Sequence, residues 1–292
     1  MQALISHLGI AFMRFTAWLP LPWVRAMGWL LGWLLHAVVQ SRKDVVRTNL
    51  ALCFPELSQD QLTRLTRQVF TNFAQAWMDR GWLWHAPEAV VSQRLSLIGA
   101  VDELRGNAPT IIFGPHFMGM DACGCAVMMN IKRQYTCIYT DQSNKIVDAW
   151  MLRGRQRFSV ARLFDRAAGV REIAASLKNG EPLYLLPDMD FGDNGTMFVP
   201  FFGIPTATVP SLSRFARLGN AKVVPVVTEL TPTGYEVRVL SAWQNFPTKD
   251  AEADTARMNA EIEGYIRQMP AQYYWVHKRF KTRPPGVASV YK

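Results

Sequence analysis

The chain has 292 residues, of which 49% are hydrophobic and only 19% charged, and it carries a formal net charge of +9 with a pI near 9.6. This length allows one large or two small domains with a substantial core. The charge indicates an anionic partner such as lipid headgroups, phosphates or an acidic protein. We expect no nucleic-acid partner, because the sequence contains no nucleic-acid-binding module, zinc-ligand spacing or arginine-rich arm.

Residues 1–41 form an apolar segment that we predict to be a membrane anchor. Between residues 3 and 39 only Arg14 and Arg25 carry a charge, and prolines at positions 20 and 22 divide the stretch. Neither half is a clean run of about twenty apolar residues, the length that a membrane-spanning helix needs. We therefore expect a single anchor that is tilted or kinked at the prolines. The alternative is a helical hairpin buried inside the globular domain.

The second half of this segment has features of a membrane–water interface. Trp29 and Trp33 are aromatic residues of the kind that gather at headgroup level. Arg42, Lys43 and Arg47 follow at once. By the positive-inside rule these cations place the bulk of the chain on the cytoplasmic side of a membrane.

Residues 42–292 are predicted to form a single α/β domain. A capping box at residues 58–61 opens a helix in which apolar residues follow helical spacing up to Trp77. Further along, predicted strands at 110–113, 135–139, 182–186, 222–228 and 235–240 alternate with predicted helices at 119–130, 144–157, 169–178, 208–218 and 251–268, and residues 187–205 are expected to be a loop. This alternation favours a central mixed, partly parallel sheet that is flanked by helices.

The junction between the first predicted strand and the helix after it contains a candidate catalytic pair. The strand ends at Gly114-Pro115, a strong turn signal, and His116 and Asp121 follow five positions apart. Residues at this spacing cannot face each other on one helix, so the pair can meet only if His116 lies in the turn and Asp121 in the first helical turn. An imidazole that is oriented by a carboxylate can take a proton from a hydroxyl.

The next candidate region follows the strand at 182–186. Asp188 and Asp190 lie in an acidic, glycine-rich stretch, which is typical of a substrate-binding loop. The two carboxylates could also bind a cation, or they could cap turns, which is the commoner use of such residues. Further along, Phe201 and Phe202 either line an apolar substrate slot or belong to the core, and the sequence leaves both roles open.

Two clusters of basic residues complete the candidate site. Arg155 and Arg157 belong to an arginine-rich stretch that is either a solvated basic face or a site for phosphate or an acidic carrier protein. Near the C-terminus Arg279 lies among other cations and follows three aromatic residues at 273–275. Aromatic residues beside cations suit a membrane–water interface that holds phosphorylated headgroups.

The four cysteines show no paired framework. Their spacing favours reduced thiols in the core of a cytosolic domain. Neither a metal site nor a cofactor is expected.

Several motifs together resemble the glycerolipid acyltransferase superfamily, and within it the late acyltransferases of bacterial lipid A biosynthesis. The resemblance covers essentially the whole chain and rests on the His-x4-Asp spacing from His116 to Asp121 and on residues 49–56 (NLALCFPE), 187–192 (PDMDFG), 198–203 (FVPFFG), 223–225 (VVP) and 272–284 (QYYWVHKRFKTRP). Each motif is weak alone, but their order is specific. One departure is that the family usually has glutamate where this chain has Asp121.

The resemblance implies an enzyme of the inner membrane that faces the cytoplasm. Such an enzyme moves a fatty acyl chain from acyl carrier protein to the 3-hydroxyl of an acyl chain on a phosphorylated glucosamine lipid. In this scheme His116 is the general base, Asp121 orients it, and Arg157, Asp188 and Arg279 bind the acceptor. The oxyanion would be stabilised by backbone amides after Gly114 or by Arg157.

Two alternatives remain open from the sequence. The acceptor could be another glycolipid or a lysophospholipid, since the thioester chemistry would be the same. The chain could also be a non-catalytic lipid-binding protein of the same fold at the membrane surface.

Overall fold

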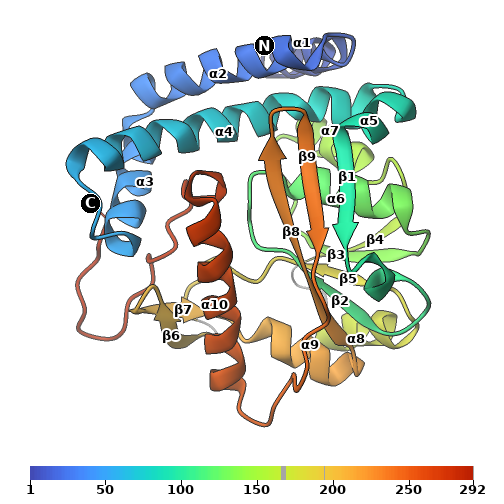
Figure 1. Ribbon diagram of the computed structural model, residues 1–292, viewed down its shortest axis with the longest axis vertical. Helices are drawn as coiled ribbons and strands as arrows, with labels where there is room; N and C mark the ends of the chain where they lie inside the picture. Colours follow the sequence, from blue (N-terminus) through green and yellow to red (C-terminus); the bar gives the residue numbers. More distant parts are fainter. Residues whose placement is uncertain (166–168, 194, 292) are drawn as a thin grey trace.

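The computed structural model describes residues 1–165, 169–193 and 195–291 and has a central seven-stranded sheet (Figure 1). The strands are β1 (Leu95–Gly99), β2 (Thr110–Phe113), β3 (Tyr135–Tyr139), β4 (Ala161–Asp165), β5 (Leu183–Leu185), β8 (Lys222–Thr231) and β9 (Gly234–Val239), in the order β1-β9-β8-β2-β5-β3-β4. All neighbours are parallel except β8 and β9. The predicted mixed, partly parallel sheet is confirmed.

Helices cover both faces of this sheet. They are α5 (Glu88–Arg94), α6 (Met120–Asn130), α7 (Lys145–Arg155), α8 (Val170–Lys178), α9 (Ser211–Gly219) and α10 (Ala251–Gln268), with short 3-10 turns at Val101–Leu104 and Pro270–Gln272. Alternate residues of one strand point to opposite faces. Accordingly Ile112 of β2 packs in a cluster with α6, whereas Ile111 and Phe113 pack in the larger cluster that contains residues of α9 and α10.

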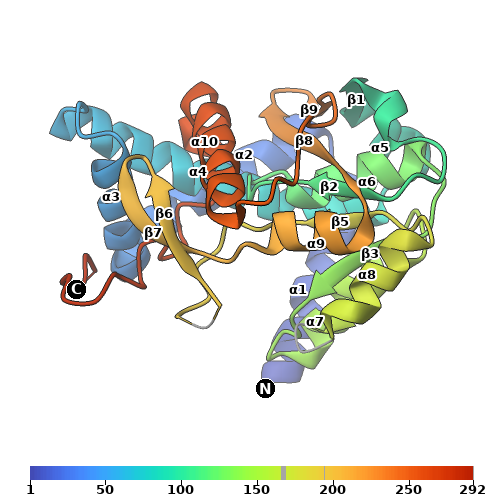
Figure 2. The same ribbon diagram turned by 90° about the horizontal axis from the view of Figure 1, so that it is seen from below.

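The structure contains strands that the sequence reading missed. The predicted loop at 187–205 includes β6 (Met197–Phe201), which pairs with β7 (Ile204–Thr208) in an antiparallel hairpin (Figure 2). Its two turn residues, Phe202 and Gly203, both have positive φ, at 51° and 73°. Two-residue hairpins require this conformation and usually use Asn-Gly or Asp-Gly, so Phe-Gly gave little signal.

The N-terminal part of the chain is helical and consists of α1 (Gln2–Thr16), α2 (Leu21–Val38), α3 (Gln40–Cys53) and α4 (Gln59–His85). Helices α1 and α2 form an outer layer against the rest of the protein (Figure 1). Figure 1 shows α4 running between the α1–α2 layer and the sheet. A Cβ atom on Gly28 or Gly32 would lie 2.7 or 2.6 Å from a Cα atom of α4, so these glycines allow α2 and α4 to touch along their backbones.

The alternative of a hairpin buried inside the globular domain differs from the structure, and the expected membrane anchor stays a prediction. Arg25 on the inner side of α2 forms an ion pair of 3.1 Å with buried Asp79 and donates to the carbonyl of Gly234, which ties α2 to α4 and β9. The outer side of both helices remains exposed. None of the helices in the described ranges is both long and apolar enough to cross a membrane.

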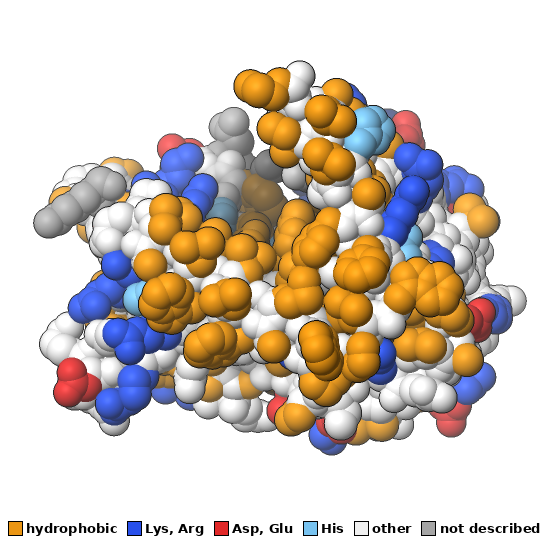
Figure 3. Space-filling view, turned by 90° about the horizontal axis from the view of Figure 1, so that it is seen from above, with side chains coloured by type: hydrophobic (Ala, Val, Ile, Leu, Met, Phe, Trp, Pro, Cys, Tyr) orange, Lys and Arg blue, Asp and Glu red, His pale blue; other side chains and the backbone are white. Residues whose placement is uncertain are grey.

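The outer side of α1 and α2 forms a continuous exposed surface, which we call the apolar face (Figure 3). It consists of Leu4, Ile5, Leu8, Phe12, Phe15, Trp18, Trp23, Trp29, Leu30, Trp33, Leu34 and Val38, each at least 44% exposed. A soluble monomer rarely presents so many large apolar side chains together, so this face indicates an interaction surface.

The cysteines lie where the sequence predicted. Cys53, Cys123 and Cys125 are buried, Cys137 is half-buried, and all four are free thiols. Burial raises the pKa of each of these thiols, which keeps them protonated and unreactive.

Candidate active site

Two adjacent parallel strands bring the chemically active side chains together. Strand β2 pairs with β5 so that Phe113 lies beside Leu185. His116 follows Phe113 by three residues, and Asp188 follows Leu185 by three residues. Because parallel strands end at the same edge of a sheet, both side chains emerge at one point.

The turn at the end of β2 fixes the backbone of His116. A Cβ atom on Gly114 would lie 2.7 Å from the ring of Tyr184 on β5, so this position requires glycine. The backbone N–H of His116 donates to Asp188 Oδ2 at 2.9 Å. These contacts hold His116 in the turn, where its side chain is 15% exposed.

Asp188 orients the imidazole of His116. The distance from His116 Nδ1 to Asp188 Oδ1 is 2.6 Å, and the Asp188 side chain is 1% exposed. Burial alone would raise the pKa of Asp188, but the attraction of His116 and the hydrogen bonds that Asp188 accepts hold this pKa below its usual value. An ionised Asp188 can only accept, so in the neutral form of the imidazole Nδ1 carries the proton and Nε2 presents a lone pair. Nε2 has no hydrogen-bond partner among the described residues.

The segment from Gln272 to Thr282 clamps this pair from the other side. Tyr273 forms a bridge with Phe117, and its hydroxyl donates to Asp188 Oδ2 at 2.9 Å. The backbone N–H of Tyr274 donates to the carbonyl of His116 at 2.9 Å. The segment thus fixes both the base and the acid that orients it.

This C-terminal segment was predicted to face phosphorylated headgroups, and the structure contradicts that prediction. Tyr273, Trp275 and Phe280 are buried in the main core. Arg279 is 2% exposed and donates to the carbonyl of Ala207 and the hydroxyl of Thr208 on β7. Its guanidinium group holds the hairpin in place and is not open to an acceptor.

The predicted pairing of His116 with Asp121 is also wrong. Asp121 lies in the first turn of α6, where its two carboxylate oxygens are each bound by an arginine: Arg80 at 2.8 Å and Arg155 at 2.8 Å. Burial raises the pKa of Asp121, but the two arginines outweigh burial and lower this pKa to about 2. The carboxylate in contact with His116 comes from the neighbouring strand instead.

The two aspartates predicted to bind substrate have structural partners. Asp188 is occupied by His116 and Tyr273, as described above. Asp190 is buried, and its carboxylate accepts from the backbone N–H of Gly192 and from the backbone and hydroxyl of Thr282. The backbone N–H of Asp190 donates to His277 Nε2 at 3.0 Å. Asp190 therefore joins the acidic loop to the C-terminal segment.

The predicted oxyanion donors are already engaged. The backbone N–H groups of His116, Phe117 and Met118 donate to Asp188, Pro115 and Gln272 respectively. Arg157 donates to the carbonyls of Leu83 and Ala86 at the end of α4. These donors make contacts within the fold, with a side chain in the case of His116 and with backbone carbonyls in the others.

The two phenylalanines predicted as an apolar slot pack against other residues. Phe201 is fully buried in the main core. Phe202 is half-buried in the hairpin turn, where its ring lies 5.2 Å from that of Phe54 and its N–H donates to Glu263. The core interpretation, which the sequence left open, holds for Phe201.

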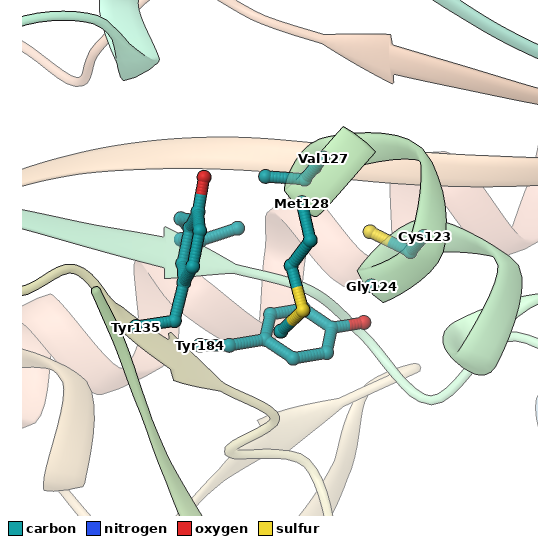
Figure 4. A pocket seen from close by; sticks show the side chains of 7 residues that line it. Cys123, Gly124, Val127, Met128, Tyr135 and Tyr184 are labelled. Atoms are coloured by element: carbon teal, nitrogen blue, oxygen red, sulfur yellow. The ribbon is translucent and has the colours of Figure 1, made fainter. Parts of the chain in front are cut away.

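A small pocket lies between α6 and the strands β2, β3 and β5 (Figure 4). It is lined by Ile112, Cys123, Gly124, Val127, Met128, Tyr135 and Tyr184. Its cavity volume of about 10 Å³ holds at most one water molecule, so it has no room for an acyl chain.

Sequence reasoning missed Tyr273, Arg80 and the orienting role of Asp188. The last of these had a usable signal: if 110–113 and 182–186 are adjacent parallel strands, residues three positions beyond them meet. Tyr273 and Arg80 are far from the turn in sequence, and only the packing of α4 and the C-terminal segment brings them near.

Comparison with known proteins identifies relatives over nearly the whole chain. Residues 1–282 match the family described as bacterial lipid A biosynthesis acyltransferase. Among curated proteins of Escherichia coli K12, the chain is 30% identical to the lipid A biosynthesis lauroyltransferase and 29% identical to the palmitoleoyltransferase, in each case over 98% of this chain and 94% of the relative. It is 29% identical to the myristoyltransferase over 84% of this chain and 76% of that protein.

Proposed function

The chain belongs to the bacterial lipid A biosynthesis acyltransferase family and is an O-acyltransferase, and from this premise we propose its substrates and mechanism. The proposed donor is acyl carrier protein with a fatty acyl chain in thioester linkage. The proposed acceptor is a hydroxyl of an acyl chain on a phosphorylated glucosamine lipid, the lipid A precursor. The net charge of +9 suits both partners, because each is anionic.

The observation that carries this proposal is the geometry of His116. Asp188 holds Nδ1, the side chain is partly exposed, and Nε2 is left without a partner in the described residues. An imidazole in this state can remove a proton from an alcohol that approaches Nε2. The proposal therefore assigns Asp188, and not Asp121, as the acid that orients the base.

The reaction then proceeds by nucleophilic attack on the thioester. Nε2 takes the hydroxyl proton while the oxygen forms a bond to the thioester carbonyl carbon. The carbon–sulfur bond breaks, and the imidazolium returns its proton to the departing thiolate. Asp188 stabilises the imidazolium between these two proton transfers.

The proposed place of action is the cytoplasmic surface of the inner membrane. The apolar face presents four tryptophans together with aliphatic side chains, and Arg42, Lys43 and Arg47 follow on α3. Helices with an apolar side and adjacent cations lie in the interfacial layer of anionic membranes. We therefore propose that α1 and α2 lie flat in one leaflet, in place of the single anchor first expected.

Replacing Trp18, Trp29 and Trp33 by serine together should weaken membrane binding at least tenfold. Each aromatic ring that no longer enters the bilayer interface weakens the free energy of membrane binding by roughly 1 kcal/mol, and about 1.4 kcal/mol corresponds to a tenfold change in the binding constant. Binding is measured by co-sedimentation with vesicles of phosphatidylethanolamine and phosphatidylglycerol.

A matched control replaces three exposed apolar residues elsewhere, Val160, Leu218 and Val287, by serine. This control should sediment like the unchanged protein. Equal sedimentation of the tryptophan variant and the control would contradict the proposed orientation.

The substrate assignment is tested by expression in a bacterial strain that lacks its own late acyltransferase. We expect mass spectrometry to show lipid A molecules heavier by one acyl chain, and no such gain with the His116→Ala variant. An unchanged lipid A, with expression of the protein verified, would reject lipid A as the acceptor and favour another glycolipid or a lysophospholipid.

A further inference from the structure

Asp121 holds two arginines from different helices in one cluster. Arg80 extends from α4 and Arg155 from the last turn of α7, and each uses its Nε atom to bind one oxygen of Asp121. The Asp121 side chain is 9% exposed, that of Arg80 13% and that of Arg155 30%. Two guanidinium groups share a single carboxylate, so the cluster carries a net charge of +1.

Among the residues that the structure describes, the terminal amino groups of both arginines have no hydrogen-bond partner. A guanidinium group has five N–H donors, and only the Nε donor of each arginine is used here. Aromatic rings support both groups: Arg80 Cζ lies 4.2 Å from the ring centroid of Trp77, and Arg155 Cζ lies 5.7 Å from that of Tyr139. The donors are therefore fixed in place before any ligand arrives.

The negative charge of Asp121 does not by itself explain why two arginines bind it. One guanidinium group would balance the carboxylate, whereas two leave a positive charge in a place where Arg80 is mostly buried. A buried charge without a counterion costs free energy, and a second anion beside the cluster would remove that cost.

The cluster lies close to the candidate base. The ring of Tyr274 is centred 6.2 Å from the ring of His116, and the Tyr274 N–H donates to the His116 carbonyl. Burial raises the pKa of Tyr274, and the nearby positive charge of Arg80 opposes this rise. Asp121 lies in the first turn of α6, only five residues after His116, so an anion bound by the two arginines would lie near the turn that holds His116.

We infer that Arg80 and Arg155 bind a phosphate group of a substrate and that Asp121 positions them for it. Paired arginines suit phosphate because their planar N–H donors match its oxygens. The inference rests on the proposed function for the source of the phosphate, which is either the lipid acceptor or the acyl donor. It gives Asp121 a positioning role that is separate from the base.

The kinetic test compares an Arg80→Gln variant with the unchanged enzyme on acceptors that carry or lack phosphate. We expect the KM for the phosphorylated acceptor to rise roughly 10- to 100-fold, the range for hydrogen bonds to charged groups, with little change in kcat. The KM for the dephosphorylated acceptor should not change. A rise confined to the KM of the donor would instead assign the phosphate to the donor.

The matched control is Arg64→Gln, which removes the same charge from an exposed position of the same helix. Arg155→Gln supplies the same test from the other helix if the first variant fails to fold. The inference would be overturned if the Arg80 and Arg155 variants had the same KM as the Arg64 variant for each acceptor and for the donor.

A binding measurement separates this inference from the proposed function. Inorganic phosphate is titrated into the full-length protein in a calorimeter, without any acyl transfer. The unchanged protein and the Arg64→Gln variant should bind it, and the Arg80→Gln variant should bind at least about tenfold more weakly. If phosphate binds while lipid A is not acylated, the site stands and the acceptor assignment fails. If no variant differs in phosphate affinity, the site is rejected even when lipid A is acylated.

Discussion

Replacement of His116 by alanine is expected to lower kcat by about 10²–10⁴, the contribution of a positioned general base. The acceptor hydroxyl is a poor nucleophile until its proton is removed, and Nε2 of His116, at the end of β2, has no partner in the described part of the chain. The measurement is the rate of acyl transfer in a single turnover with saturating donor and acceptor, so that chemistry is observed and binding is not.

The loss must be separated from a loss of structure. Removing the imidazole leaves Asp188 buried with donors only from the backbone of residue 116 and from Tyr273, so a modest loss of stability accompanies the change. Circular dichroism and vesicle sedimentation should nevertheless show a folded, membrane-bound protein. Acyl transfer at the unchanged rate by this variant would remove His116 from the mechanism.

Replacement of Asp188 by asparagine is expected to reduce kcat by a comparable factor, about 10²–10⁴, with little effect on the size or shape of the side chain. Asparagine can turn its amino group toward Nδ1, which then becomes the acceptor. The proton would move to Nε2, and the nitrogen that faces the acceptor could no longer act as a base. The loss should therefore appear in kcat and much less in KM.

A spectroscopic measurement distinguishes an orienting acid from a merely structural one. The short 2.6 Å contact between Nδ1 and Asp188 should give a far-downfield proton resonance in the unchanged protein. We expect the Asp188→Asn variant to lose this resonance and the Asp121→Asn variant to keep it, with a much smaller drop in kcat. The reverse pattern would restore Asp121 as the partner of His116.

Local sequence signals were sufficient for most of the sheet and its helices. The strand at 110–113 and the helices at 119–130 and 251–268 were predicted nearly as they occur, because each has a clear apolar period and a defined end. The hairpin around Phe202 was missed because its turn adopts positive φ without the residues that normally signal it. In that case tertiary packing decides the backbone conformation.

The candidate site was predictable only in part, for a different reason. The position of His116 follows from one strand and one turn, which are local features. Its partner depends on which strands are neighbours, and the choice of Asp188 over Asp121 was decided by the pairing of β2 with β5. The role of Arg279 was misread because charge in a sequence does not reveal which carbonyl groups of the folded chain a buried guanidinium group will bind.

The clamp formed by residues 272–282 has a consequence for when the enzyme becomes competent during its synthesis. Chains emerge from the ribosome N-terminus first, so α1 and α2 are available to meet the bilayer long before Tyr273 has been made. Until that tyrosine docks, neither Asp188 nor the His116 carbonyl has its full set of partners. Under the proposed function, a nascent chain could therefore meet the bilayer while still inert, and it would gain a working base only after residues 272–282 had been made and docked.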